Sequence, residues 1–124
     1  MTITYEVDAG AGLAFEEWRG VVTADDVHAH WTRMVNDPAV LACRGSLADI
    51  RECWVDFTGP DLQRLALTLL EPAFRGQQLR VAILVKDPVQ YGVARQHRAF
   101  ASTFTEAAVF TDAAMAREWL LSPG

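Results

Sequence analysis

The pattern of apolar and polar residues along the chain predicts five β-strands. The longest apolar run covers residues 79–85, Leu-Arg-Val-Ala-Ile-Leu-Val, and ends at the helix-start signal Lys86-Asp87-Pro88. An apolar run of this length is typical of a strand that is buried on both faces. We therefore expect residues 79–85 to form the centre of a sheet.

The other four strands are shorter or half-buried. Residues 2–8 and 13–18 alternate between apolar and polar side chains, which is typical of strands with one face in the core. The Ala-Gly-Ala-Gly segment between them permits a tight turn and so predicts an antiparallel hairpin. Residues 46–50 and 107–110 are the third and fifth predicted strands, and residues 51–57 are expected to form an apolar connection.

Between the strands, apolar residues recur at intervals of three and four, which predicts four main helices. Their expected N-terminal caps are Thr23, Thr58, Asp87 and Thr111, because oxygen-bearing side chains at these positions can accept hydrogen bonds from free amides of the first turn. Pro72 is expected to help end the second helix. The residues expected to face inward are Val27, Trp31, Met34 and Val35; Leu62, Leu65, Ala66, Leu69 and Leu70; Val89, Val93, Gln96 or His97, and Phe100; and Ala116, Trp119 and Leu120.

The alternation of strands and helices predicts a single α/β domain over residues 1–124. Successive helix starts are about 30 residues apart, the length of a strand–helix–strand unit. Right-handed crossovers then make strands two to five parallel and leave the first strand as an antiparallel edge. If the helices cover one face of the sheet, the opposite face carries Arg80, Ala82 and Leu84 or the residues that alternate with them, and a homodimer would cover an apolar stripe there.

Four segments in this order resemble the SpoIIAA-like fold, the group that contains STAS domains. They are residues 20–26, residues 47–51, residues 81–88 with Tyr91-Gly92, and residues 109–112 with Ala116 and Trp119-Leu120. More particularly, the chain looks like the small bacterial STAS-like proteins of unknown function that are grouped with this fold. The resemblance implies a five-stranded mixed sheet and a regulatory or binding module that acts without catalysis.

The resemblance to STAS regulators also implies a phosphorylated Ser or Thr just after the third strand. Here Arg51 follows Asp49-Ile50, so this acceptor is missing, although Ser46 and Thr58 are near in sequence. A phosphate would add roughly two negative charges beside a helix start, which Arg51 cannot do. The fold is also grouped with CRAL-TRIO domains, which makes a lipid-binding carrier the alternative.

Composition and charge exclude several classes of function. The 124 residues carry a formal net charge of −5, which argues against a dedicated nucleic-acid binder. No apolar run approaches the roughly 18 residues of a transmembrane helix, and the first residues lack the features of a signal peptide. We expect a cytoplasmic protein with reduced Cys43 and Cys53.

The expected site lies at the carboxyl ends of the parallel strands, where α/β proteins bind their ligands. Helix N-termini converge there and favour anions. A large aromatic side chain in a connection, Trp54, would cover the core, line a pocket or contact another subunit. The candidate ligand-binding residues are Arg51, Trp54, Thr58, Lys86, Asp87 and Tyr91, with helix capping as the simpler role for Thr58 and Asp87.

The sequence offers little for catalysis. His28 and His30 are two apart on a helix and point in different directions, while Asp26 and His30 could pair at the surface. We expect no metal and no cofactor, because no cluster of three or four ligands is present. A small enzyme that uses Cys53 or Asp49 is the least favoured hypothesis. The favoured one is a binding module for a protein partner or a small apolar or anionic ligand.

Overall fold

The computed structural model describes residues 2–123 and contains one five-stranded sheet. The strands are β1 (Ile3–Asp8), β2 (Leu13–Thr23), β3 (Gly45–Asp56), β4 (Leu79–Leu84) and β5 (Thr105–Phe110). Their order in the sheet is the order in the chain. β1 pairs with β2 in antiparallel fashion, and the other pairs are parallel. The expected topology is confirmed, with β4 between two parallel neighbours.

The helices follow the strands at the expected places. They are α1 (Ala24–Val35), the short α2 (Pro38–Leu41), α3 (Gly59–Leu65), α4 (Glu71–Phe74), α5 (Pro88–Phe100) and α6 (Ala113–Leu121). Thr23, Thr58 and Asp87 are N-caps, as predicted. The expected cap at Thr111 is wrong by one residue, because Asp112 accepts the hydrogen bond from the Met115 amide at 3.0 Å. No helix in residues 2–123 is long and apolar enough to span a membrane.

Two strands are longer than predicted. β2 continues through residues 19–23, and β3 includes most of the segment that we expected to be a connection. Both continue because they pair with each other, from Leu13 opposite Gly45 to Thr23 opposite Asp56. The pairing slips once, so that β3 has one extra residue between Asp49 and Glu52. Such a bulge hides the alternation that would otherwise reveal the strand.

Pro72 does not end the second helix. A π-helical turn, η1 (Ala66–Leu70), joins α3 to α4, and Pro72 lies in the first turn of α4. The Glu71 amide reaches back five residues to the Ala66 carbonyl. Since proline lacks an amide hydrogen and crowds the preceding turn of an α-helix, the wider turn explains how the chain continues past it.

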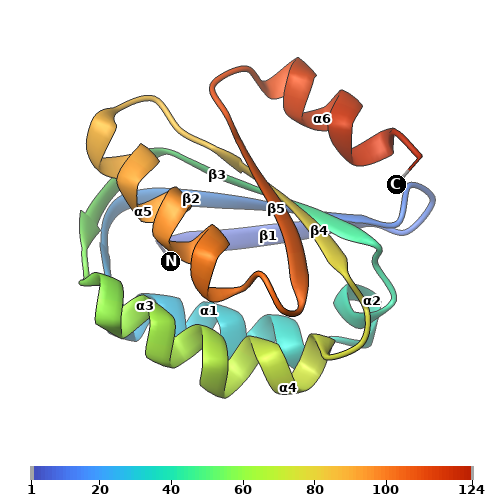
Figure 1. The fold of residues 1–124 in the computed structure, drawn as a ribbon, viewed down its shortest axis with the longest axis horizontal. Coiled ribbons are helices and arrows are strands. Elements are labelled where there is room, and N and C mark those ends of the chain that lie inside the picture. Colours follow the sequence, from blue (N-terminus) through green and yellow to red (C-terminus); the bar gives the residue numbers. More distant parts are fainter. Residues whose placement is uncertain (1, 124) are drawn as a thin grey trace.

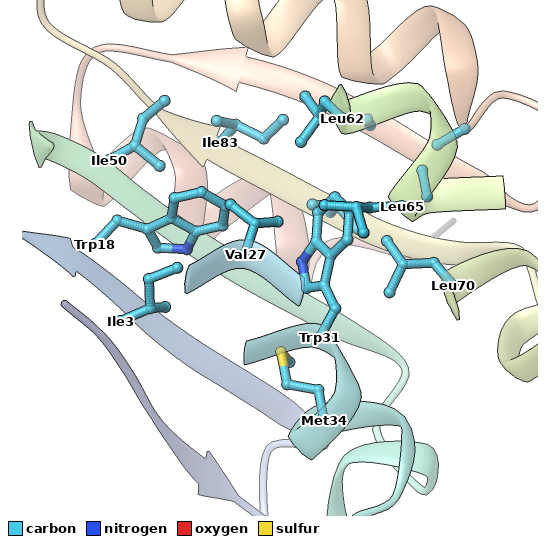
Figure 2. Close-up of a cluster of buried hydrophobic side chains, with 14 of the residues drawn as sticks. Ile3, Trp18, Val27, Trp31, Met34, Ile50, Leu62, Leu65, Leu70 and Ile83 are labelled. Atoms are coloured by element: carbon cyan, nitrogen blue, oxygen red, sulfur yellow. The ribbon is translucent and has the colours of Figure 1, made fainter. Parts of the chain in front are cut away.

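The main core lies between one face of the sheet and the helices α1, α3, α4 and α5. Figure 1 shows α1, α3 and α4 along one side of the sheet and α6 on the other. Trp18 from β2 and Trp31 from α1 are the large aromatic members of this core, and Figure 2 shows them among aliphatic side chains. The aliphatic members seen there are Ile3, Val27, Ile50, Leu62, Leu65, Leu70 and Ile83.

The second face of the sheet is covered by α6. Ala116 and Leu120 pack there against Leu13, Leu47, Ala82 and Leu84, with Phe110 and Trp119 at the margin. The Arg80 guanidinium lies 4.1 Å from the Trp119 ring centre and donates to the Ser122 carbonyl at 2.8 Å. The chain itself therefore covers the apolar stripe for which we had expected a homodimer.

Candidate functional site

The two predicted site residues at helix starts both act as caps. The Thr58 hydroxyl accepts from the Asp61 amide at 3.2 Å, and Asp87 accepts from the Gln90 amide at 2.8 Å. The Gln90 side chain is buried and donates to the carbonyls of Arg51 and Cys53. It therefore joins the start of α5 to the end of β3.

The two predicted cations at this end of the sheet already have acidic partners. Arg51 donates to both carboxylate oxygens of Asp49, at 3.0 and 2.8 Å. Burial opposes ionisation of Asp49, but the hydrogen bonds and charge of Arg51 outweigh it and hold the pKa of Asp49 below its usual value. The Lys86 ammonium lies 3.4 Å from Glu52. Neither cation is therefore left without a counter-charge.

The two predicted aromatic residues lie on exposed surfaces. Trp54 is in β3 rather than in a connection, and its side chain is 74% exposed. Its neighbours Cys53 and Val55 face the main core, so Trp54 points to the opposite side of the sheet. Tyr91 is 48% exposed on α5, near Arg95. No ring contact joins Trp54 to Tyr91 within residues 2–123.

The main core contains a cavity of about 80 Å³ between the sheet and the helices. Most of its wall is aliphatic or aromatic, with contributions from every strand except β1. The polar groups of the wall include Glu16, Ser46, His97 and Thr105. A cavity of this size exceeds the roughly 10–15 Å³ that one water molecule needs.

The carboxylate in this wall belongs to Glu16, which is only 5% exposed. Its Oε1 accepts from the Trp18 indole at 3.1 Å and from His30 Nε2 at 2.5 Å. His30 is fully buried on α1, and the rings of Tyr5 and Trp18 each lie 5.8 Å from it. The expected surface pairing of His30 with Asp26 is wrong, because Asp26 instead completes the capping box with Thr23.

His97 is the second histidine of the interior. It lies on α5 in the cavity wall, and its ring centre is 5.5 Å from that of Trp31. Burial lowers the pKa of His97 to about 4, although the charge of Glu16 acts in the opposite direction. The imidazole is therefore neutral near pH 7. Its Nδ1 atom has no hydrogen-bond partner among the described residues.

Glu16 is not among the site residues predicted from the sequence, and His30 was expected at the surface. Glu16 alternates with Ala14 and Trp18 in β2, and these three side chains share the face toward the helices. His30 lies three residues after Val27 and four before Met34, on the buried stripe of α1. Both positions could have been inferred from periodicity, but charged side chains are usually assigned to the surface.

The helix face of α5 also differs from the expectation. Val89 is 64% exposed, whereas Gln90, Ala94 and His97 face inward. This helix therefore turns a polar residue at its start and another near its end toward the sheet. Of the two residues expected at the inward position, His97 is buried and Gln96 is exposed.

The cysteines offer no activated thiol. Cys43 and Cys53 are both free and buried. Burial, with a smaller contribution from the charge of Asp87, raises the pKa of Cys53 to about 11. A nucleophilic cysteine needs a lowered pKa, so these surroundings do not favour the hypothesis of an enzyme that uses Cys53. Within residues 2–123, no group of three or more His, Cys, Asp or Glu side chains could hold a metal ion.

The five-stranded mixed sheet, with helices on both faces, gives the chain a SpoIIAA-like α/β fold. A similar solved structure is an uncharacterized protein of the DUF3478 family with a SpoIIAA-like fold, from Shewanella loihica PV-4. It has a TM-score of 0.65 and 22% sequence identity, and the match covers 95% of this chain and 93% of that one. No protein-family model matches this chain, and no curated protein does so either. The expected resemblance is confirmed at the level of the fold.

Proposed function

We propose that this chain is a binding module that holds a small, mainly apolar ligand in the cavity of the main core. The observation that carries the proposal is the cavity of about 80 Å³ with its largely apolar wall. Protein interiors are close-packed, and spaces larger than a water molecule are few. An apolar cavity stays dry and accepts apolar molecules.

The volume of the cavity favours a small ligand over a lipid. An engineered cavity of roughly 150 Å³ is known to accept benzene. The present cavity is about half that size, which suits a five-membered ring or a short chain rather than an acyl chain. Met34 lies in the wall, and its flexible side chain can adapt to the shape of a ligand. The small-ligand hypothesis is therefore better supported than the lipid carrier.

Binding of furan, a five-membered ring without a hydrogen-bond donor, tests this proposal. We expect furan to raise the unfolding temperature and to shift the methyl resonances of Leu62, Ile83 and Val93, which line the cavity. Shifts confined to surface residues, or no shift at millimolar furan, would contradict the proposal.

Two matched substitutions separate cavity binding from general packing. Ala48 lines the cavity, whereas Ala82, on the adjacent strand, is fully buried under α6. Ala48→Val fills part of the cavity, so we expect weaker furan binding and little loss of stability. The larger side chain of Ala82→Val would crowd the packed core under α6, so we expect the free energy of unfolding to fall by about 1–3 kcal/mol. Furan binding should be unchanged.

A second candidate function is self-association through the exposed end of β2 and β3. Trp54 and Val21 are cross-strand neighbours there, with exposures of 74% and 56%. The next pair on the same face of the sheet, Arg19 and Glu52, is also exposed and carries both signs of charge. A patch with an apolar centre and opposite charges is complementary to a second copy of itself across a twofold axis.

Analytical ultracentrifugation at increasing concentration tests the second candidate. We expect a dimer that Trp54→Ala converts to a monomer. Tyr91→Ala is the matched control, because Tyr91 is also an exposed aromatic residue but lies on α5. A wild-type protein that stays monomeric, or a dimer that is unchanged by Trp54→Ala, would contradict this candidate.

A further inference from the structure

The geometry of the cavity wall points to a polar anchor that selects neutral ligands with an O–H or N–H group. We propose that Glu16 Oε2 accepts a hydrogen bond from the ligand and that His97 Nδ1 forms a second contact. This inference rests on the proposed function, because it identifies the class of ligand that the same cavity holds.

The hydrogen bonds of Glu16 leave one carboxylate oxygen for a ligand. Trp18 and His30 both donate to Oε1, and no described residue donates to Oε2. The residue is 5% exposed and lines the cavity, so bulk water does not solvate it freely. A carboxylate oxygen that has no protein donor remains available to a ligand, so a ligand in the cavity that donates to Oε2 gains a hydrogen bond.

His97, on α5, supplies a second polar atom to the lining of the cavity. It is 9% exposed, and its Nδ1 atom is without a partner among residues 2–123. The imidazole is neutral near pH 7, since burial lowers its pKa to about 4. A neutral imidazole donates or accepts according to its tautomer, so a hydroxyl group could donate to Glu16 and contact His97 as well.

The charges around the cavity disfavour an anionic ligand. The acidic Glu16 lies in the wall, and His97 carries no charge that would balance a second anion there. An anion in an apolar cavity would also lose its hydration. The anionic alternative from the sequence therefore does not fit this cavity.

The carboxylate is held in place before any ligand binds. Trp18 is two residues from Glu16 on the same strand, and His30 reaches the same oxygen from α1. His30 is itself held between the rings of Tyr5 and Trp18. An anchor fixed from two elements does not need to be ordered on binding, which favours affinity.

Three five-membered rings of similar shape test the inference on the wild-type protein. Pyrrole has an N–H donor, furan has an oxygen in its place, and pyrrole-2-carboxylate adds an anion. Isothermal titration should show that pyrrole binds at least about tenfold more tightly than furan, as expected for a hydrogen bond to a charged acceptor. Pyrrole-2-carboxylate should not bind detectably.

The outcomes distinguish this inference from the proposed function. Equal binding of pyrrole and furan would overturn the anchor and leave the cavity-binding module intact. Failure of both rings to bind would overturn both proposals. Tighter binding of pyrrole-2-carboxylate than of pyrrole would also overturn the anchor.

A conservative variant assigns the selectivity to Glu16. Glu16→Gln keeps the shape of the side chain, and its oxygen can still accept from Trp18 and His30, while an NH₂ group replaces the free oxygen. We expect the preference for pyrrole over furan to disappear. Glu17→Gln, on the exposed face of the same strand, should leave the preference unchanged. An unchanged preference in a folded Glu16→Gln protein would contradict the inference; if that variant does not fold, the wild-type comparison decides.

Discussion

The interior of this protein contains ionisable side chains, and burial among apolar residues changes the pKa of some of them. His97 is the clearest case, because burial lowers its pKa from 6.5 to about 4. The unfolded chain therefore binds one more proton than the folded chain between these two pH values. The free energy of unfolding is unaffected by this group above about pH 6.5 and falls as the pH is lowered toward 4.

We expect this titration to lower the free energy of unfolding by as much as about 3 kcal/mol between pH 6.5 and pH 4. Urea unfolding at a series of pH values measures it. His97→Leu should flatten the slope within this window, whereas His28→Ala, at an exposed position on α1, should not. Parallel slopes for the wild-type and His97→Leu proteins would show that His97 titrates normally.

Substitution of two glycines by alanine should change the free energy of unfolding in opposite directions. A Cβ atom on Gly45 would lie 3.0 Å from the Arg80 carbonyl oxygen and 3.2 Å from side-chain atoms of Leu13 and Leu120. Gly45→Ala should therefore lower the free energy of unfolding by about 1–3 kcal/mol.

Gly92 is the matched control in α5, since a Cβ atom there meets nothing within 4 Å. Gly92→Ala should raise the free energy of unfolding by about 0.8–1 kcal/mol, because glycine is unfavourable inside a helix. Chemical denaturation of both variants measures the difference. The same sign of change in both would contradict the packing described around Gly45.

At the residue scale, the sequence predicted caps better than it predicted burial. A cap depends on one side chain and the three residues after it, so the sequence alone predicts Thr23, Thr58 and Asp87 as N-caps. The burial of Glu16 and His30 depends on how β2 packs against α1, which follows it directly in the chain, and this packing forms only in the folded state. The proposed anchor could not be found without that pairing.

At the element scale, β3 was harder to predict than β4. β4 is apolar on both faces and needs no partner to be recognised. The second half of β3 is a strand because β2 continues beside it, and the bulge near Arg51 interrupts its pattern. The predicted position of Trp54 was wrong for the same reason, because it was expected in a connection and lies in β3 instead.

The contribution of α6 to stability can be measured at two adjacent leucines. Leu120 is 1% exposed and packs on the sheet, whereas Leu121 is 49% exposed. Leu120→Ala should cost about 2–5 kcal/mol, and Leu121→Ala should change the free energy of unfolding by less than about 0.5 kcal/mol. Thermal and urea unfolding measure both changes. Equal stability of the two variants would contradict the packing of α6 on the sheet.

At the scale of the whole molecule, the topology was the most predictable property. Alternating strands and helices permit few arrangements once crossovers are right-handed, so the parallel pairs followed from the element order. The side of the sheet that each helix covers did not follow. Alone among the main helices, α6 packs on the second face, where a second copy of the chain had been expected.

Removal of residues 113–124 tests the role of α6 for the whole molecule. The truncation would uncover Leu13, Leu47 and Leu84, which form an apolar stripe across three strands. We expect the shortened chain to self-associate, because exposed apolar patches promote association. Light scattering measures this. The full chain with Met115→Ser, an exposed position on α6, should not change, and a monomeric truncated chain would contradict the prediction.

The order of the strands has a consequence for synthesis on the ribosome. Since the sheet order is the chain order, each strand leaves the exit tunnel when its neighbour is already available. Domains begin to form from the N-terminus during translation, and here no strand needs to be inserted between two others. The open edge moves from β2 to β5 as the chain grows, and α6 can cover the second face only at the end. Until then, the nascent sheet exposes the stripe that chaperones would be expected to bind.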